Sequence, residues 1–197
     1  MKRGRLEAFS DGVLAIVITI MVLEMKAPEG ASWTALSELW PVFLSYVLSF
    51  VYVGIYWNNH HHLIATVDRV DGSIMWANLH LLFWLTLVPF VTGWMGENEF
   101  APIPTTAYGV VLIMAAIAYV ILQSRILATQ SPESALRHEL GKDLKGKLSP
   151  LLYLVGIAVA QFAPMIAFGI YSLVAVIWFI PDRRVERAVR QSQHNET

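Results

Sequence analysis

Long apolar runs separated by short polar connections are the feature that most restricts how this chain folds. A helix that crosses a membrane needs about 20 largely apolar residues, and 56% of the 197 residues are hydrophobic while only 15% are charged. Soluble proteins carry roughly 25% charged residues, so an ordinary water-soluble globule is excluded. We therefore predict an all-α, polytopic membrane protein with the lipid bilayer as a partner.

The apolar runs predict six membrane-spanning helices. The last apolar stretch is interrupted by the sequence Phe162-Ala163-Pro164, which favours a tight turn between two short helices. A single long helix or a re-entrant hairpin is the alternative for this stretch. The six predicted spans are residues 6–25, 36–58, 73–94, 106–127, 148–162 and 165–180, inside a membrane domain of residues 1–181 that a cytoplasmic tail of residues 182–197 follows.

The basic residues predict the orientation of these spans. Cytoplasmic loops of membrane proteins are enriched in Lys and Arg, and thirteen of the fourteen basic residues lie in segments that share one side of a six-span protein. Lys26 alone lies on the other side, where the third-to-fourth connection carries Glu97 and Glu99. Both termini are therefore predicted to be cytoplasmic, and one long helix over 148–180 is disfavoured because it would place four arginines outside.

The first predicted span differs from the others because it carries acidic residues within it. Charge in hydrocarbon is costly, so such a span is a functional candidate, and only twelve uncharged residues separate Asp11 from Glu24. At 100° per residue, Asp11 and Glu7 lie nearly opposite one stripe of the helix. That stripe consists of Gly12, Ile16, Thr19, Ile20 and Leu23.

Other chemistries find little support in the sequence. No paired catalytic carboxylates, Ser/His pair or HExxH motif lies within the spans, so we predict no enzyme and no cofactor. The apolar composition excludes a nucleic-acid-binding chain, because such chains are polar and carry a strong charge bias. The consecutive residues His60, His61 and His62 point 100° apart on a helix, so we expect hydrogen bonding at the membrane interface and no metal site, even with His80 nearby.

The opening motif resembles the signature of the endosomal/lysosomal potassium channel family, transmembrane protein 175. The motif is Arg5-xxx-Phe9-Ser10-Asp11-Gly12, followed by Ala15-Ile16 and Thr19, and the Trp57–His62 segment extends the likeness to most of the chain. The resemblance is to small prokaryotic single-repeat members. It implies a homotetramer with the first helix of each subunit around a central pore, in a non-canonical potassium channel fold without the TVGYG filter, which this sequence also lacks.

The resemblance also assigns roles along the first helix. It implies hydrophobic constrictions at Ile16, Ile20 and Leu23 and a selectivity hydroxyl layer at Thr19, with K⁺ as the permeant ion. A narrow apolar ring closes a pore by dewetting, and a ring of hydroxyl oxygens is a weak-field site, so we expect modest preference for potassium over sodium. The alternative is that the stripe packs against another helix and Thr19 bonds its own backbone.

The same resemblance implies that polar side chains of neighbouring helices hold the Phe-Ser-Asp residues. Asp11 faces away from the stripe, so its predicted role is structural, and Ser10 is expected to bond a backbone carbonyl one turn back. Arg5 lies about 120° from Asp11 around the helix, so we expect it to meet a neighbouring helix, another subunit or lipid phosphate. The candidate partners of the motif are Trp57, Asn58, His60, Asn78 and His80.

The sequence leaves two functions from different classes. A passive, potassium-selective channel follows from the opening motif and its stripe, and the resemblance to single-repeat prokaryotic members implies a bacterial inner membrane. A proton- or metal-coupled transporter would instead use Asp11 and the histidines, and saturable, coupled uptake would distinguish it from the channel.

Overall fold

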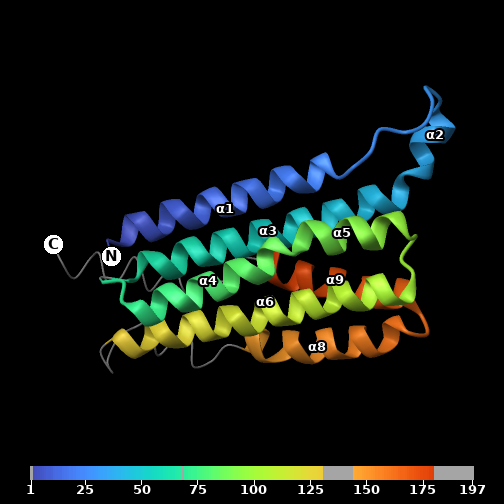
Figure 1. Cartoon of the computed structure of the whole chain (residues 1–197). Coiled ribbons are helices and arrows are strands. Elements are labelled where there is room, and N and C mark those ends of the chain that lie inside the picture. The colour runs from blue at the N-terminus through green and yellow to red at the C-terminus, as the bar shows by residue number, and fades with distance from the viewer. Residues whose placement is uncertain (1, 68, 131–143, 180–197) are drawn as a thin grey trace.

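The computed structural model describes residues 2–67, 69–130 and 144–179. The predicted tail of residues 182–197 and residues 131–143 of the fourth-to-fifth connection lie outside this range. Every regular element of the described chain is an α-helix, and the long helices lie alongside one another in an elongated bundle (Figure 1). The helices are α1 (Arg3–Leu23), α2 (Trp33–Glu38), α3 (Trp40–Ala65), α4 (Gly72–Thr86), α5 (Val88–Glu97), α6 (Pro102–Thr129), α8 (Leu144–Ala160) and α9 (Pro164–Phe179).

Proline residues set several of the helix boundaries. Pro41 and Pro89 occupy the first turns of α3 and α5, where the missing N–H costs no hydrogen bond. Pro89 therefore divides the predicted third span into α4 and α5, which follow each other along the bundle (Figure 1). Pro164 begins α9 directly after the turn that the sequence predicts at Phe162.

The second predicted span differs most from the structure. The sequence predicts it over residues 36–58, whereas the short helix α2 ends at Glu38 and α3 runs from Trp40 to Ala65. Helix α3 passes through the polar run from Asn58 to His62, where His60 bonds Asn78 of α4 and His61 pairs with Glu7 of α1. Within the described residues, four segments are long and apolar enough to cross a membrane, namely α1, α3, the α4–α5 unit and α6, while α8 and α9 contain shorter apolar segments.

Buried hydroxyl groups link the centre of the bundle. The Ser49 hydroxyl of α3 lies 2.6 Å from the hydroxyl of Thr92 on α5 and 2.9 Å from that of Tyr108 on α6. All three side chains are buried, and hydrogen bonds between helices satisfy such groups away from water. Near the end of α5, Gly96 lets the helix approach α3 closely, because a Cβ there would lie 2.8 Å from the Cα of Val42.

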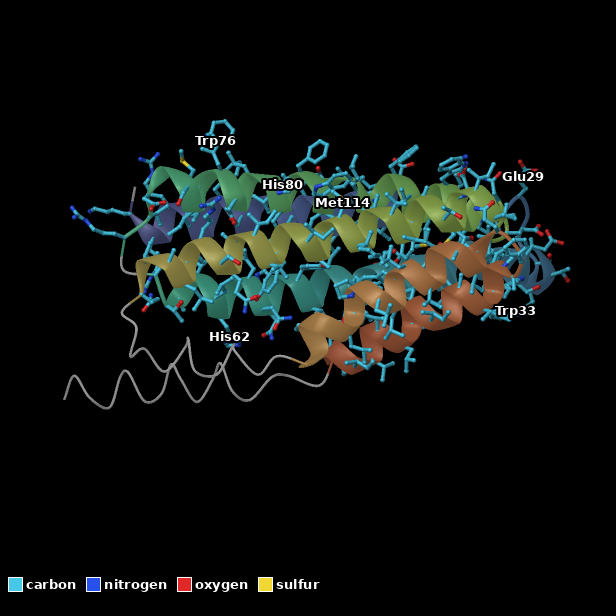
Figure 2. The ribbon with its side chains drawn as sticks, turned by 90° about the horizontal axis from the view of Figure 1, so that it is seen from below. Glu29, Trp33, His62, Trp76, His80 and Met114 are labelled. Carbon is cyan, nitrogen blue, oxygen red and sulfur yellow. The ribbon has the colours of Figure 1, made fainter. Side chains whose placement is uncertain are left out.

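Exposed tryptophans lie toward both ends of the bundle. Trp33 is 86% exposed and Trp76 is 70% exposed. Figure 2 shows them toward opposite ends, with Glu29 at the end that carries Trp33 and His62 toward the end that carries Trp76. Tryptophan concentrates at the two interfaces of a membrane. This distribution agrees with a bundle whose long axis crosses the bilayer.

Candidate pore helix and the polar contacts that hold it

Helix α1 has one packed face and one uncovered face. Its packed face consists of Leu6, Ser10, Leu14, Val17 and Met21, which are buried against α3, α4 and α5. The opposite stripe is uncovered: Ile16 is 58% exposed, Ile20 is 39% exposed and Leu23 is 78% exposed. Among the helices of a single copy that the structure describes, none packs over the residues of the predicted constriction.

Thr19 lies on the uncovered stripe and also bonds its own helix. Its hydroxyl donates to the carbonyl of Ile16 at 2.9 Å, which is the bond that the alternative interpretation expects. A hydroxyl that donates its proton keeps its oxygen lone pairs as acceptors. The bond fixes the direction of the hydroxyl and leaves the oxygen able to face a cation.

A buried chain of hydrogen bonds joins α1, α4 and α3. The Ser10 hydroxyl donates to the carbonyl of Leu6 at 2.9 Å, and the Asn78 amide nitrogen donates to the Ser10 oxygen at 3.0 Å. The Asn78 carbonyl oxygen lies 2.6 Å from His60 Nε2, so Nε2 carries the proton and donates. Ser10, Asn78 and His60 are each at most 1% exposed, and His60 Nδ1 has no partner in the described structure.

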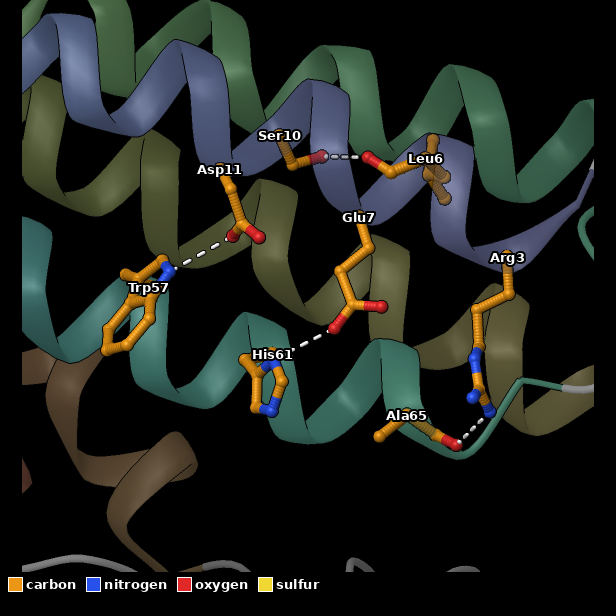
Figure 3. A network of polar contacts seen from close by, with 8 residues as sticks. All are labelled: Arg3, Leu6, Glu7, Ser10, Asp11, Trp57, His61 and Ala65. Atoms are coloured by element: carbon orange, nitrogen blue, oxygen red, sulfur yellow. Dashed lines mark hydrogen bonds and ion pairs between the residues drawn. The ribbon is translucent and has the colours of Figure 1, made fainter.

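A second set of contacts ties α1 to α3 along their exposed edge (Figure 3). The Trp57 indole N–H donates to Asp11 at 3.0 Å, His61 pairs with Glu7 at 2.9 Å, and Arg3 donates to the carbonyl of Ala65 at 2.9 Å. From one pair to the next, the position on α1 changes by four residues and the position on α3 changes by four residues in the opposite direction. Residues four apart share a helix face, so two antiparallel helices bring these pairs into register one after another.

The remaining predicted residues take other positions. Arg5 and Phe9 are exposed, on the same side of α1 as the uncovered stripe. His80 accepts a hydrogen bond from Trp84 of its own helix at 3.0 Å and does not join the motif. Asn58 makes no side-chain hydrogen bond within the described residues.

Sequence reasoning missed Arg3, Glu7 and His61 as contributors to these contacts. The signal was present, because polar or charged residues recur at intervals of four on both helices. As for metals, the described part of the chain contains no group of three or more His, Cys, Asp or Glu side chains that could hold an ion.

Comparison with known proteins identifies the family to which the chain belongs. The family described as "Endosomal/lysosomal potassium channel TMEM175" matches residues 5–89, which contain nearly all of α1, all of α3 and α4, and every polar contact described above that α1 makes except that of Arg3. A protein of Chryseobacterium sp. (strain P1-3), named a potassium channel, is 55% identical over 98% of this chain and 100% of its own length. The chain belongs to the TMEM175 family.

Two further comparisons extend the TMEM175 likeness to the fold. A protein of Chamaesiphon minutus, named a potassium channel, is 33% identical over 88% of this chain and 91% of its own length. The crystal structure of a lysosomal potassium-selective channel TMEM175 homolog from the same organism superposes with a TM-score of 0.77 at 31% identity, covering 89% of this chain and 95% of that one. This TMEM175 member is therefore an all-helical, multi-pass protein of the cell membrane from a family of ion channels, not of enzymes.

Proposed function

We propose that this TMEM175 member is a passive cation channel with a modest preference for potassium over sodium. It assembles as a homotetramer in which α1 of each subunit lines a central pore. The observation that carries the proposal is the uncovered stripe of α1, whose opposite face is packed and hydrogen-bonded. Because one face of α1 packs against its own subunit, the uncovered face is available to line the centre of an assembly.

The residues of the stripe divide into two roles. Rings formed by Ile16, Ile20 and Leu23 close the pore, because a narrow apolar constriction excludes water and hydrated ions. A ring of Thr19 hydroxyls offers oxygen atoms to a partly dehydrated ion, and its direction is supported by the bond to Ile16. K⁺ is the permeant ligand, and the proposal needs no cofactor.

The polar contacts on the packed side of α1 fix the orientation of this pore-lining helix. Asp11 and Ser10 hold the rotation of α1 relative to α3 and α4 through Trp57 and Asn78. Because Ser10 and Asp11 face away from the stripe, a change in either residue alters the direction in which the stripe points. Asp11 thus contributes to assembly and not to the charge of the pore.

The proposal includes six spans with both termini in the cytoplasm of a bacterial cell. The charges at the two ends of the bundle support this orientation, since Arg3, Arg69 and Arg125 lie at or near the N-terminal end, while Lys26 lies at the other beside Glu97. The α8–α9 hairpin supplies the last two spans, which are shorter than the other four.

Reversal potentials in planar bilayers with K⁺ on one side and Na⁺ on the other test the proposal. We expect a potential that favours K⁺, a loss of that preference in Thr19→Ala, and a several-fold higher basal conductance in Ile16→Asn because the amide rehydrates the constriction. Thr129→Ala is the matched control for Thr19→Ala, because Thr129 makes the same bond three residues back, to Ile126 on α6. An unchanged selectivity in Thr19→Ala would refute the role of the hydroxyl layer.

The competing function is a proton- or metal-coupled transporter. The buried His60, with Nδ1 unpartnered in the described structure, is the observation that favours proton coupling. The same bilayers distinguish the two functions, because a coupled transporter gives saturable flux with a fixed stoichiometry to protons. Flux that follows the K⁺ gradient alone and does not saturate supports the channel.

A further inference from the structure

A small cavity lies between α3, α6, α8 and α9. It has a volume of about 50 Å³, and none of its lining residues belongs to α1. Helix α8, which contributes part of the lining, lies on the opposite side of the bundle from α1 (Figure 1). The cavity is therefore separate from the uncovered stripe of α1 and from the pore that this stripe lines in the proposed assembly.

The spacing of residues on two helices produces this cavity. On α3, Tyr52, Tyr56 and Asn59 follow one another at intervals of four and three residues, and on α6, Ala116 and Gln123 lie seven residues apart. Each set therefore shares one helix face. Ala116 carries a single methyl group in a lining that consists largely of aromatic rings. So small a side chain does not fill the space between the rings.

The volume of the cavity restricts its occupant to very small molecules. An apolar cavity of about 150 Å³ takes benzene, whereas one water molecule needs about 10–15 Å³. A cavity of about 50 Å³ is thus too small for an aromatic ring and has room for about three to five water molecules.

The polar groups of the lining distinguish water from an apolar occupant. The Tyr56 hydroxyl and the side-chain amides of Asn59 and Gln123 form no hydrogen bond within the described residues. Tyr56 is only 9% exposed, and its unbonded oxygen still borders space that a water molecule can reach. The end of an acyl chain would leave this hydroxyl unpaired, which is unfavourable for a buried polar group.

Other groups of the lining add acceptors and exclude ions. The Tyr52 hydroxyl donates to the carbonyl of Tyr171 at 2.6 Å, and its oxygen keeps its lone pairs as acceptors. None of the lining residues is charged, so an ion in the cavity would lack a counter-charge. A water molecule needs two to four polar partners, and the side chains of Tyr52, Tyr56, Asn59 and Gln123 offer them.

We propose that this cavity holds a cluster of about three to five ordered water molecules that bridges α3 and α6. The cluster bonds the Tyr56 hydroxyl and the amides of Asn59 and Gln123, and it reaches the Tyr52 hydroxyl at its deep end. Tyr52 lies thirteen residues before the end of α3 at Ala65, which is about 20 Å along the helix axis. The membrane bundle therefore contains a hydrated site far inside it and away from the pore.

Hydroxyl-radical labelling by X-ray radiolysis of the full chain in lipid nanodiscs tests the proposal, with mass spectrometry as the readout. Radicals that form from ordered water label the side chains beside it. We expect Tyr56 to be labelled several-fold faster than Tyr108, which is buried outside the lining with its hydroxyl 2.9 Å from that of Ser49. A bulky radical scavenger in the buffer should slow the labelling of the exposed Trp33 and leave the rate at Tyr56 unchanged.

A variant that fills the cavity provides the second measurement. Ala116→Leu places a larger apolar side chain in the lining and should lower the labelling rate at Tyr56 several-fold. Ala128→Leu is the matched control, because Ala128 is exposed on the same helix outside the lining, and it should leave the rate unchanged. If Ala116→Leu does not fold, Ala116→Val makes the same change with a smaller side chain.

Three results would overturn the proposal. Labelling of Tyr56 no faster than that of Tyr108 would show that the cavity is dry. Labelling that the scavenger suppresses at Tyr56 as strongly as at Trp33 would show that the radicals come from bulk solvent. Equal labelling of Tyr56 in the unaltered protein and in the cavity-filling variant would place the water elsewhere. The measurement needs no ion flux, so its outcome is separate from that of the channel proposal.

Discussion

Replacing Asn78 by leucine removes the centre of the buried chain that joins α1, α3 and α4. The change keeps a similar side-chain volume and deletes the bond to His60 Nε2 at 2.6 Å and the bond to the Ser10 oxygen at 3.0 Å. Ser10 keeps its bond to the carbonyl of Leu6, whereas the His60 N–H loses its acceptor. The cost therefore falls mainly on His60.

The magnitude follows from the number of bonds and the burial of the groups. A side-chain hydrogen bond between membrane helices contributes about 0.6 kcal/mol on average and at most about 1.7. A buried donor left without an acceptor costs about 1–3 kcal/mol, and His60 is only 1% exposed. We expect Asn78→Leu to lower the free energy of unfolding by about 2–3 kcal/mol.

Unfolding in mixed micelles of mild detergent and sodium dodecyl sulfate, followed by circular dichroism, measures this change. Asn58→Leu is the matched control, because Asn58 is partly exposed and makes no side-chain hydrogen bond within the described residues; its effect should stay within about 0.5 kcal/mol. The double variant Ser10→Ala/Asn78→Leu should lose less than the sum of the single losses, since the two residues share one bond. If Asn78→Leu were no less stable than Asn58→Leu, the reasoning would be refuted.

Two further predictions concern packing and pH. Gly96→Ala should lower stability by about 1–3 kcal/mol, because its Cβ would lie 2.5 Å from the Ser45 hydroxyl and against the α3 backbone. A Cβ at Gly93 on the same helix has no heavy atom within 4 Å, so Gly93→Ala should not lower stability. Thermal unfolding of both variants checks this prediction. Asp71 caps α4, and the hydrogen bond from the Ile74 N–H holds the pKa of its carboxyl below the usual 3.8. This lowered pKa stabilises the fold above pH 3.8 and the benefit is lost as the pH falls through the lowered pKa. The stability advantage over Asp71→Asn should therefore shrink on acidification, and a constant difference across the pH range would contradict the assignment.

The sequence predicts the two faces of α1 because helical periodicity and burial act on the same positions. A stripe at intervals of three and four residues identifies Ile16, Ile20 and Leu23 as one face, and that face is the uncovered one in the structure. The break at Pro89 and the turn before Pro164 are equally local, because proline restricts its own backbone. Features that depend on a single stretch of chain are therefore accessible from the sequence.

The pairing between helices is not accessible in the same way. Periodicity places Asp11 opposite the stripe, but it does not say that Trp57 will meet it or that His80 will bond Trp84 instead. Helix α3 also extends beyond the span of residues 36–58 that the sequence predicts: the polar run from Asn58 to His62 stays helical, with His60 and His61 bonded to partners on other helices. Those partners depend on the rotation and axial shift of each helix, which tertiary packing sets.

The polar contacts of α1 are unevenly distributed along its length. Every hydrogen bond or ion pair from a described side chain of α1 to another helix comes from Arg3, Glu7, Ser10 or Asp11, all in its N-terminal half. The half that carries Ile16 and Leu23 is held by apolar contacts, which have no preferred direction. The N-terminal half of α1 is thus fixed in rotation by polar contacts, whereas the C-terminal half is held only by apolar packing. We therefore expect a force applied through the loop that contains Lys26 to displace the C-terminal half of α1 more easily than the N-terminal half.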